Sequence, residues 1–365
     1  MIYLDHAATS FPKPPVVRLA MDRAMERCAN PGRGGHKPAM TAAETVFSCR
    51  ETASAFFNCS PEQVVFTANC THGLNLAIHT LAEPGSRVLV SGFEHNAVTR
   101  PLHTLKAEMV VAGTRLFDRA DTLEAFEAAL KRGVDAAVFT HVSNVFGYIL
   151  PVEEMAALCR RYGVPFAVDA AQSAGSQTVD FARWGADFVA MPGHKGLMGP
   201  MGTGLLLCAW TPKPLLSGGT GSMSLQQQMP DFLPDGAEAG TLNVAGIAGL
   251  EAGIRYVDQR GISTIARRER TLAQYCAAGL QELGFQVFSG PDQGGVVSFV
   301  PPMDCLQAAD RLAERGIAVR AGLHCAPLAH RSAGTLETGT VRLSLGAHTE
   351  NRQIAHFLQN ARILR

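Results

Sequence analysis

The sequence predicts an α/β protein with a large domain, built on a doubly wound and mostly parallel sheet, and a smaller α+β domain. The first observation is the length of 365 residues, of which 47% are hydrophobic and 18% charged. This composition suits two folded domains and excludes a disordered chain. The second is an alternation of short apolar segments with helical stretches from about residue 60 to residue 210. Wholly apolar strands separated by helices are typical of a parallel sheet covered on both faces.

The strands of the large domain are expected to be short and fully buried. They lie at 64–67, 87–91, 136–140, 165–169, 187–191 and 204–208, with helices expected over 71–81 and 152–162. Their richness in Val, Phe, Ala and Leu favours strands over loops.

The third observation is a change of composition after residue 210. Gly, Ser, Gln and Pro dominate 217–240, which predicts long loops. Helices are then expected over 243–259, 263–283, 306–315 and from 350, with strands at 296–300, 317–320 and 341–344. We expect an N-terminal segment over 1–14 that joins the small domain and the active site, a large domain over 15–250 and a small domain over 251–365.

Charge and cysteine content narrow the function classes. Lys and Arg total 32, as do Asp and Glu, so the net charge is zero and no basic surplus indicates nucleic acid or an anionic membrane as a partner. No apolar run approaches the roughly 18 residues of a membrane span, and residues 1–6 do not resemble a signal peptide. The nine cysteines include no Cys-x-x-Cys pair, so no metal site is expected. We expect reduced thiols and a cytoplasmic location.

The chemistry-bearing residues follow the predicted strands. Ligands of open parallel sheets bind beyond the carboxyl ends of the strands. The segments at those ends are 68–73, 94–96, 141–144, 169–172 and 192–196. They carry His, Asn, Asp, Gln and Lys side chains and a small-residue turn that opens a helix, and a helix N-terminus favours an anion. We therefore expect one site along this edge.

Each of these residues also has an ordinary interpretation when taken alone. His95 and His194 are compatible with satisfied polar side chains, Asp169 and the turn at Thr71 with helix capping, and Lys195 with a solvated loop lysine. Together they match the needs of pyridoxal 5′-phosphate. That cofactor requires a Lys to form an imine, an Asp to keep its pyridine nitrogen protonated, an anion site and a flat group against its ring.

Six motifs resemble the class V aminotransferase family of fold-type I pyridoxal-phosphate enzymes. They are Tyr-Leu-Asp-His-Ala-Ala-Thr at 3–9, Thr-His-Val-Ser-Asn at 140–144, Val-Asp-Ala-Ala-Gln-Ser at 168–173, Gly-His-Lys at 193–195, Glu-Ala-Gly-Thr-Leu-Asn at 238–243 and Arg-Ala-Gly-Leu-His-Cys-Ala at 320–326. The last is similar to the loop of group II cysteine desulfurases and selenocysteine lyases, in which the Cys receives sulfur. The resemblance therefore implies the type I fold.

Cys325 also has a local argument. It follows His324 and lies five residues after Arg320 in a Gly-containing loop. Positive neighbours favour a thiolate, whereas a buried, inert cysteine is the alternative interpretation.

The resemblance implies a role for each matching residue. Lys195 would be the Schiff-base lysine and, with Cys325 and His95, catalytic. The cofactor would be held by Asp169 at the pyridine nitrogen, Gln172 at the phenolic oxygen, His95 against the ring, and Thr71, His72 and His194 at the phosphate. Gly219 and Thr241 would contact the phosphate of the neighbouring subunit of a homodimer. The substrate would be bound by Asn144, Arg342, Arg320 and Ala8.

The implied reaction converts L-cysteine to L-alanine, leaves a persulfide on Cys325 for an acceptor protein, and extends to L-selenocysteine. Another class V reaction, transamination or β-elimination, and a non-catalytic sulfur-relay protein are the alternatives. Cys325 in its loop argues against the first, and intact Lys195, Asp169 and His95 argue against the second. The chain departs from the pattern at Pro192, where relatives often carry a hydroxyl, and at Leu323, where they often carry His.

Overall fold

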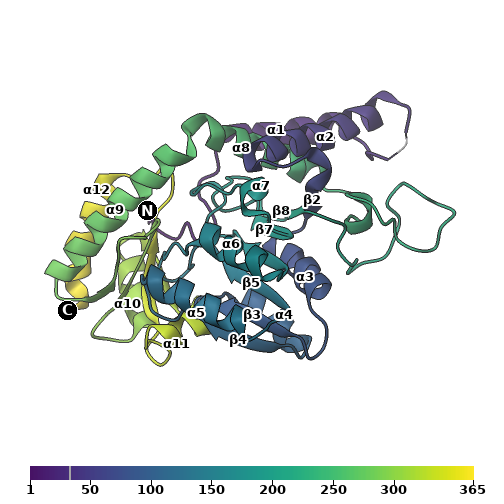
Figure 1. The fold of residues 1–365 in the computed structure, drawn as a ribbon. Helices are drawn as coiled ribbons and strands as arrows, with labels where there is room; N and C mark the ends of the chain where they lie inside the picture. The colour runs from purple at the N-terminus through teal and green to yellow at the C-terminus, as the bar shows by residue number, and fades with distance from the viewer. Residues whose placement is uncertain (33) are drawn as a thin grey trace.

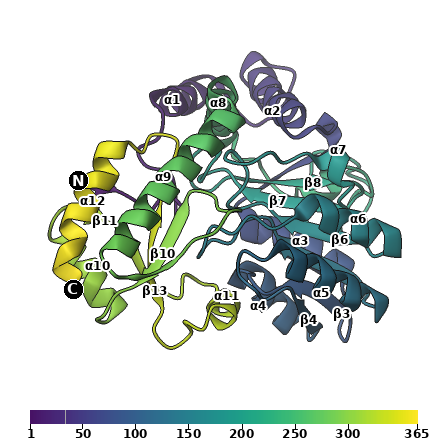
Figure 2. The same cartoon turned by 60° about the vertical axis from the view of Figure 1, so that its left-hand side comes forward.

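The computed structural model describes residues 1–32 and 34–365, and the backbone is organised around a seven-stranded and a four-stranded sheet. Figure 1 shows the larger sheet beneath and between helices, with both chain termini on the side of the smaller sheet. Figure 2 shows the long helix α9 crossing the molecule beside the strands of the smaller sheet. The architecture is α/β with a mostly parallel central sheet, as the sequence predicts.

The larger sheet has the strand order β2-β8-β7-β6-β5-β3-β4. Its strands are β2 (Val64–Thr67), β3 (Arg87–Ser91), β4 (Glu108–Ala112), β5 (Ala136–Thr140), β6 (Phe166–Asp169), β7 (Phe188–Pro192) and β8 (Gly204–Cys208). Only β8 runs against its neighbours β2 and β7, and the other pairs are parallel. The strands β2, β3, β5, β6 and β7 consequently end at one edge of the sheet.

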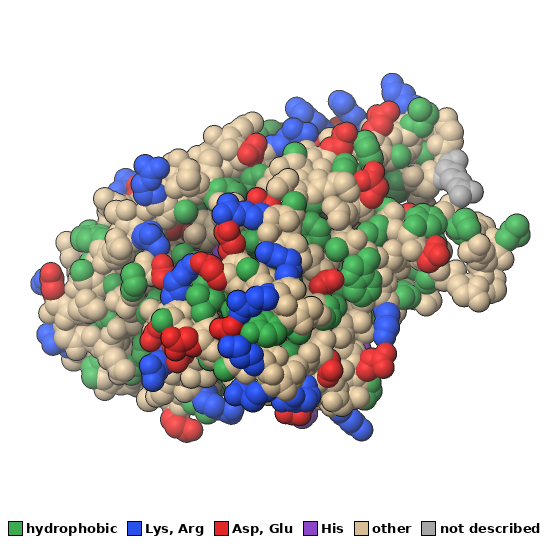
Figure 3. Space-filling view, in the orientation of Figure 1, with side chains coloured by type: hydrophobic (Ala, Val, Ile, Leu, Met, Phe, Trp, Pro, Cys, Tyr) green, Lys and Arg blue, Asp and Glu red, His purple; other side chains and the backbone are tan. Residues whose placement is uncertain are grey.

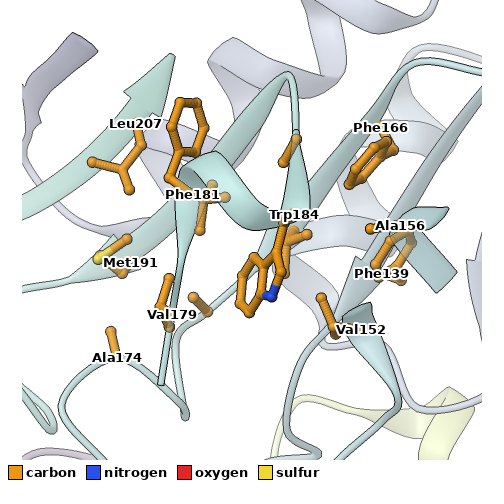
Figure 4. Packing of buried hydrophobic residues seen from close by; sticks show 14 of the residues in the cluster. Phe139, Val152, Ala156, Phe166, Ala174, Val179, Phe181, Trp184, Met191 and Leu207 are labelled. Carbon is orange, nitrogen blue, oxygen red and sulfur yellow. The ribbon is translucent and has the colours of Figure 1, made fainter. Parts of the chain in front are cut away.

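Both faces of this sheet are covered by helices, and successive strand residues point to opposite faces, so each strand contributes to two hydrophobic clusters. In β5, Phe139 packs into one hydrophobic cluster and Val138 into another. The first face is covered by α2 (Lys37–Phe57), α5 (Arg119–Lys131), α6 (Val152–Tyr162), α7 (Phe181–Trp184) and α8 (Val244–Arg260), the second by α3 (Cys70–Leu81) and α4 (Asn96–Thr104). Figure 4 shows the first cluster, where the rings of Phe139 and Phe166 stack with centroids 5.7 Å apart.

The smaller sheet is antiparallel, with the order β12-β13-β10-β9. It comprises β9 (Gln286–Phe288), β10 (Val296–Val300), β12 (Arg320–Gly322) and β13 (Thr340–Ser344), and it packs against α9 (Ile262–Glu282), α10 (Cys305–Ala313) and α12 (Asn351–Ala361). The short strand β1 (Ile2–Tyr3) pairs with β11 (Ile317–Ala318), so the first residues of the chain join its last third. Helix α1 (Pro15–Arg27) packs on α8, and α11 (Pro327–Ser332) follows the Cys325 loop.

Most expected strands and helices lie within one or two residues of their predicted bounds, and the structure differs from the prediction in three respects. No strand is predicted at β4, although residues 109–112 are apolar; as an edge strand it leaves most of its side chains exposed. The single strand expected at 317–320 is two strands, because its first half pairs with β1 and its second with β13. The sequence does not predict the helices α1, α2, α4, α5 and α11 or the strands β1 and β9, and of these α1 and α2 are rich in small or polar residues.

The segment 217–240 forms long loops, interrupted by one short 3-10 turn at Asp235–Ala237. In Figure 1 it projects from the right-hand side of the molecule. Across 1–32 and 34–365, no helix has both the length and the apolar character that crossing a membrane requires.

Candidate active site

A cavity of about 100 Å³ lies at the shared edge of β2, β3, β5, β6 and β7. It is lined by seven of the residues expected from the sequence, namely Thr71, His95, Asn144, Asp169, Gln172, His194 and Lys195. These side chains come from five separate strand ends, which converge because the strands run in the same direction.

Lys195 lies in the turn that follows β7. The turn is fixed by hydrogen bonds from the Gly193 N–H to the Thr203 carbonyl (2.8 Å) and from the Met198 N–H to the Lys195 carbonyl (3.0 Å). Burial lowers the pKa of Lys195, and Asp169 opposes this shift. A buried amine with a lowered pKa is more often neutral and therefore a better nucleophile and base.

Asp169 closes β6 and is almost completely buried, with 2% of its surface exposed. Its Oδ1 accepts hydrogen bonds from the Ala171 N–H (2.8 Å) and from the Cys70 thiol (3.5 Å). Burial, reinforced by the Asp169 carboxylate, raises the pKa of Cys70, so this thiol stays protonated and donates. The carboxylate is held in place beside the cavity.

His95 caps the N-terminus of α4. Its Nδ1 accepts a hydrogen bond from the Ala97 N–H (3.0 Å), which places the proton of the neutral ring on Nε2. Burial lowers the pKa of His95, so the ring is neutral near pH 7. The helix thereby orients a flat, uncharged ring at the cavity wall.

The N-terminus of α3 forms the anion-favouring end of the cavity. The Asn69 side chain caps the helix by accepting from the His72 N–H at 2.9 Å. Thr71 lines the cavity, but His72 does not: its Nδ1 accepts from the Ala68 N–H (3.3 Å), and it borders a neighbouring hollow of about 220 Å³. The cofactor role expected of His72 stays a prediction.

His194 is tied to the N-terminal segment. Its Nδ1 lies 3.1 Å from Thr9 Oγ1, and its carbonyl accepts from Lys13 Nζ at 2.6 Å and from the Ser10 N–H at 3.1 Å. Burial, together with Lys195 and Lys13, lowers the pKa of His194 to about 4. A neutral His194 can bind a phosphate only as a hydrogen-bond donor.

Arg342 and Arg320 meet at Asp5. Arg342 Nη2 donates to Asp5 Oδ1 at 2.9 Å, and Arg320 Nη2 donates to Asp5 Oδ2 at 2.9 Å. Arg342 Nη1 also donates to the Asn144 carbonyl (3.0 Å), while its Nε is buried without a partner in the described chain. Arg342, Arg320 and Ala8 do not line the cofactor cavity, so their substrate contacts stay predictions.

Asn144 links this network to the Cys325 loop. Its side-chain amide donates to the His324 carbonyl (2.8 Å), and its Oδ1 is buried with no hydrogen-bond partner within 1–32 and 34–365. Asn144 lines the cavity, so this acceptor is available to a bound group.

The Cys325 side chain is exposed, and its backbone is strained. His324 and Cys325 have φ of 49° and 56°, and the Cys325 carbonyl accepts from the Asn96 N–H at 2.7 Å. The expectation of a positive charge on His324 is wrong, because burial lowers its pKa to about 2. Its Nε2 bonds the Thr340 carbonyl (3.2 Å), so His324 supports the loop as a neutral ring.

Gly219 and Thr241 lie outside the cofactor cavity of their own chain. Both border a hollow of about 810 Å³ together with Arg50 and Glu238. Glu238 is buried, pairs with Arg50 at 2.5 Å and accepts from the Phe66 N–H at 2.6 Å. This ion pair fastens the loop that carries Thr241 to α2 and β2.

Sequence reasoning missed the roles of Asp5, Lys13 and Cys70. Asp5 belongs to the motif at 3–9 but contacts residues more than 300 positions away. Lys13 lies between two prolines just after that motif, and Cys70 occupies the first position of α3. The only local signal was their closeness to motifs already identified.

The aminotransferase class V family matches residues 2–357. The chain belongs to this family. It is similar to the "probable cysteine desulfurase" of Methanothermobacter thermautotrophicus, with 33% identity over 97% of this chain and 92% of that protein. The protein of the same name from Pyrococcus abyssi is 34% identical over 98% of this chain and 92% of its own length.

Solved structures give the same fold. The apo structure of the cysteine desulfurase from Thermococcus onnurineus NA1 superposes with a TM-score of 0.91 and 32% identity, and the match covers 100% of this chain and 94% of that one. Members of the family depend on pyridoxal 5′-phosphate, so the cofactor expected from the sequence is confirmed. The cavity fits that group, because it places a buried lysine, a buried carboxylate, a flat ring and the partnerless Asn144 Oδ1 around one space.

Replacing Lys195 tests the cofactor attachment. We expect Lys195→Ala to abolish the visible absorption band of the lysine-bound cofactor, because no other lysine lines the cavity in the described chain. Borohydride reduction and peptide mapping of the wild type should label Lys195. Lys213→Ala is the matched control, since Lys213 pairs with Glu83 on the surface. Label on another lysine would show that the assignment is wrong.

Replacing Asp5 tests the buried charge network. Asp5→Ala leaves the buried Arg342 without a carboxylate, and we expect a loss of about 3 kcal/mol in the free energy of unfolding. The double variant Asp5→Ala/Arg342→Met should be less destabilised, because the unpaired charge is gone. Urea denaturation measures both, and Glu83→Ala, which breaks an exposed pair, should change little. Equal destabilisation of the single and double variants would contradict the argument.

Proposed function

We propose that the chain is a cysteine desulfurase that converts L-cysteine to L-alanine and receives the sulfur on Cys325 as a persulfide. The observation that carries the proposal is the position of Cys325. Its exposed side chain borders a pocket that shares Thr71 and His95 with the cofactor cavity. The family match over 2–357 and the names of the similar proteins support the same reaction.

Pyridoxal 5′-phosphate, when bound, supplies an electron sink for bonds at the substrate's α and β carbons. Lys195 would hold it and carry protons at Nζ, and the lowered pKa of Lys195 suits it to act as a base. Asp169 would keep a positive charge at the ring nitrogen, and Thr71, with the start of α3, would bind the phosphate. His95 would lie against the ring, and Gln172 would donate to the phenolic oxygen. At present the Gln172 amide donates to the Ala7 carbonyl at 3.0 Å.

Sulfur transfer would be completed by Cys325. Its thiolate attacks the sulfur of the bound substrate, an S–S bond forms and the Cβ–S bond breaks. The electron pair of the broken bond stays with the carbon skeleton, which takes up protons and leaves as alanine. No external oxidant or reductant is needed, because the persulfide retains the sulfur removed from the substrate.

The same site would accept L-selenocysteine, because this amino acid differs from L-cysteine only in carrying selenium in place of sulfur. Transamination and β-elimination are the alternative reactions. They make no use of a cysteine beside the cofactor cavity, and the Cys325 loop is ordered by the Asn96–Cys325 hydrogen bond and contains two consecutive residues of positive φ. This ordered placement favours desulfuration, with a protein as one sulfur acceptor.

We further propose a homodimer in the cytoplasm, in which Gly219 and Thr241 of one chain reach the phosphate bound to the other. Large hydrophobic side chains are exposed on α2, within the projecting segment 217–240 and directly before it, among them Met40, Phe47, Leu225, Phe232 and Leu216. In Figure 3 hydrophobic atoms reach the end of the projecting loop, while basic and acidic side chains are interspersed over the rest of that face. An apolar surface of this kind favours a protein partner.

Replacing Cys325 tests the reaction. We expect Cys325→Ala to lose release of sulfur from L-cysteine while keeping much of the activity on L-selenocysteine, because a selenol is the more acidic leaving group. Alanine, sulfide and selenide are measured with each substrate. Cys28→Ala, at another partly exposed cysteine, is the control. Near-normal sulfide release by Cys325→Ala without added thiol would refute the proposed role.

Subunit mixing tests the composite site. A Lys195→Ala chain and a Thr241→Ala chain, each impaired alone, should recover toward half of wild-type activity as a mixed dimer, because one site then combines intact Lys195 with intact Thr241. Mixing Lys195→Ala with Asp169→Ala is the control, since both sites of that dimer stay defective. A fully active monomer, or no recovery in verified mixed dimers, would exclude the arrangement.

A further inference from the structure

A second pocket of about 320 Å³ lies beside the cofactor cavity, between α3 and α4. Its lining comprises Thr71, Asn75 and His79 from α3, His95, Asn96, Arg100 and Thr104 at and along α4, and Cys325 from the loop before α11. Thr71 and His95 border both spaces, so the pocket adjoins the cofactor cavity. The proposed sulfur-bearing thiol therefore borders a second space beside the cofactor cavity.

The lining of this pocket combines apolar and polar groups with one cationic side chain, Arg100. Among the described residues, it includes no Asp or Glu. Arg100 is exposed on α4 and makes no hydrogen bond or ion pair with the residues of 1–32 and 34–365. The side chains of Asn75, Asn96 and Thr104 add neutral hydrogen-bond donors to the lining, and Ala97 and Pro101 add apolar surface. An unpaired guanidinium beside neutral donors suits a small carboxylate, to which arginine binds bidentately.

The thiol is held toward this pocket by its backbone. The Cys325 carbonyl accepts from the Asn96 N–H at 2.7 Å, and Asn96 is itself a pocket residue. His324 and Cys325 are both in the left-handed region, which costs a non-glycine residue free energy and persists only where the surroundings impose it. The loop thus anchors the Cys325 backbone at Asn96, and Arg100 lies one helix turn further along the same face of α4.

We propose that this pocket is an acceptor site for small thiols that carry a carboxylate, with Arg100 binding the carboxylate. The inference rests on the proposed persulfide at Cys325. The acceptor thiolate attacks the terminal sulfur of the Cys325 persulfide, a new S–S bond forms on the acceptor, and the original S–S bond breaks with Cys325 thiolate as the leaving group. The step is a thiol–persulfide exchange that is redox-neutral. A pocket of this volume suits a small molecule.

The experiment measures transfer from a preloaded persulfide. The cofactor-loaded enzyme is loaded at Cys325 in two ways, with L-cysteine and with inorganic polysulfide, and freed of excess reagent. Loss of the persulfide from the Cys325 peptide is then followed by mass spectrometry after addition of 3-mercaptopropionate or of the uncharged 2-mercaptoethanol. For each thiol, the rate of persulfide loss in the wild type is divided by the rate in the variant. The intrinsic reactivity of the thiol cancels in this ratio, so the ratios for the two thiols can be compared.

We expect Arg100→Gln to slow transfer to 3-mercaptopropionate about fivefold to tenfold and to leave transfer to 2-mercaptoethanol unchanged. Arg100→Lys should retain part of the preference for 3-mercaptopropionate over 2-mercaptoethanol, and high salt should reduce this preference in the wild type. Arg331→Gln is the matched control, because Arg331 is exposed near Cys325 in the chain but does not line the pocket.

The outcomes separate the two proposals. A persulfide that forms with polysulfide but not with L-cysteine overturns the proposed desulfurase function, while the rates still test the pocket. A persulfide that forms with L-cysteine but transfers equally to both thiols in wild type and Arg100→Gln overturns the acceptor site. If Arg100→Gln slows transfer to both thiols by the same factor, Arg100 supports the structure of the loop, and the proposed acceptor site is again overturned.

Discussion

The buried guanidinium of Arg342 is the constraint on which the arrangement of the two sheets depends. Only 3% of Arg342 is exposed, so its charge requires acceptors within the protein. They come from the N-terminal segment, through Asp5, and from the loop after β5, through the Asn144 carbonyl. Since Arg342 itself lies on β13 of the smaller sheet, one side chain joins three parts of the chain around the cavity.

That network also sets the position of the Cys325 loop. Asn144 donates to the His324 carbonyl, Arg320 shares the Asp5 carboxylate, and the Asn96 N–H bonds the Cys325 carbonyl. The loop that carries the thiol is therefore bound to residues that follow strands of the larger sheet and is connected through Arg320 to the smaller sheet. A loop held only by its own residues would not sustain two consecutive positive φ angles.

Burial lowers the pKa of several basic groups of the site. The pKa of Lys195 and of His95 is lowered by desolvation, and that of His194 falls to about 4. Among the arginines around the site, Arg342 and Arg320 share Asp5, while Arg100 has no partner in the described residues. An anion entering beside Cys325 meets Arg100 as the unshared guanidinium, which is why we place acceptor binding there.

The sequence by itself determined the strands and the convergence of their carboxyl ends. Buried strands leave a local apolar pattern, and parallel strands bring their ends together, so Asp169, His95 and Lys195 could be placed around one cavity without coordinates. The resemblance of six motifs to a known family predicted the cofactor and a sulfur-receiving role for Cys325.

Tertiary structure alone decided the charge state and the contacts of other residues near the site. It shows that His324 is neutral, that His72 lies outside the cavity, that Arg342 binds Asp5 and that Arg100 lines the pocket of Cys325. The reason is that charge state and ion pairing depend on desolvation and on contacts between residues hundreds of positions apart. Helix and strand periodicity, by contrast, depends on residues that are close together in the sequence.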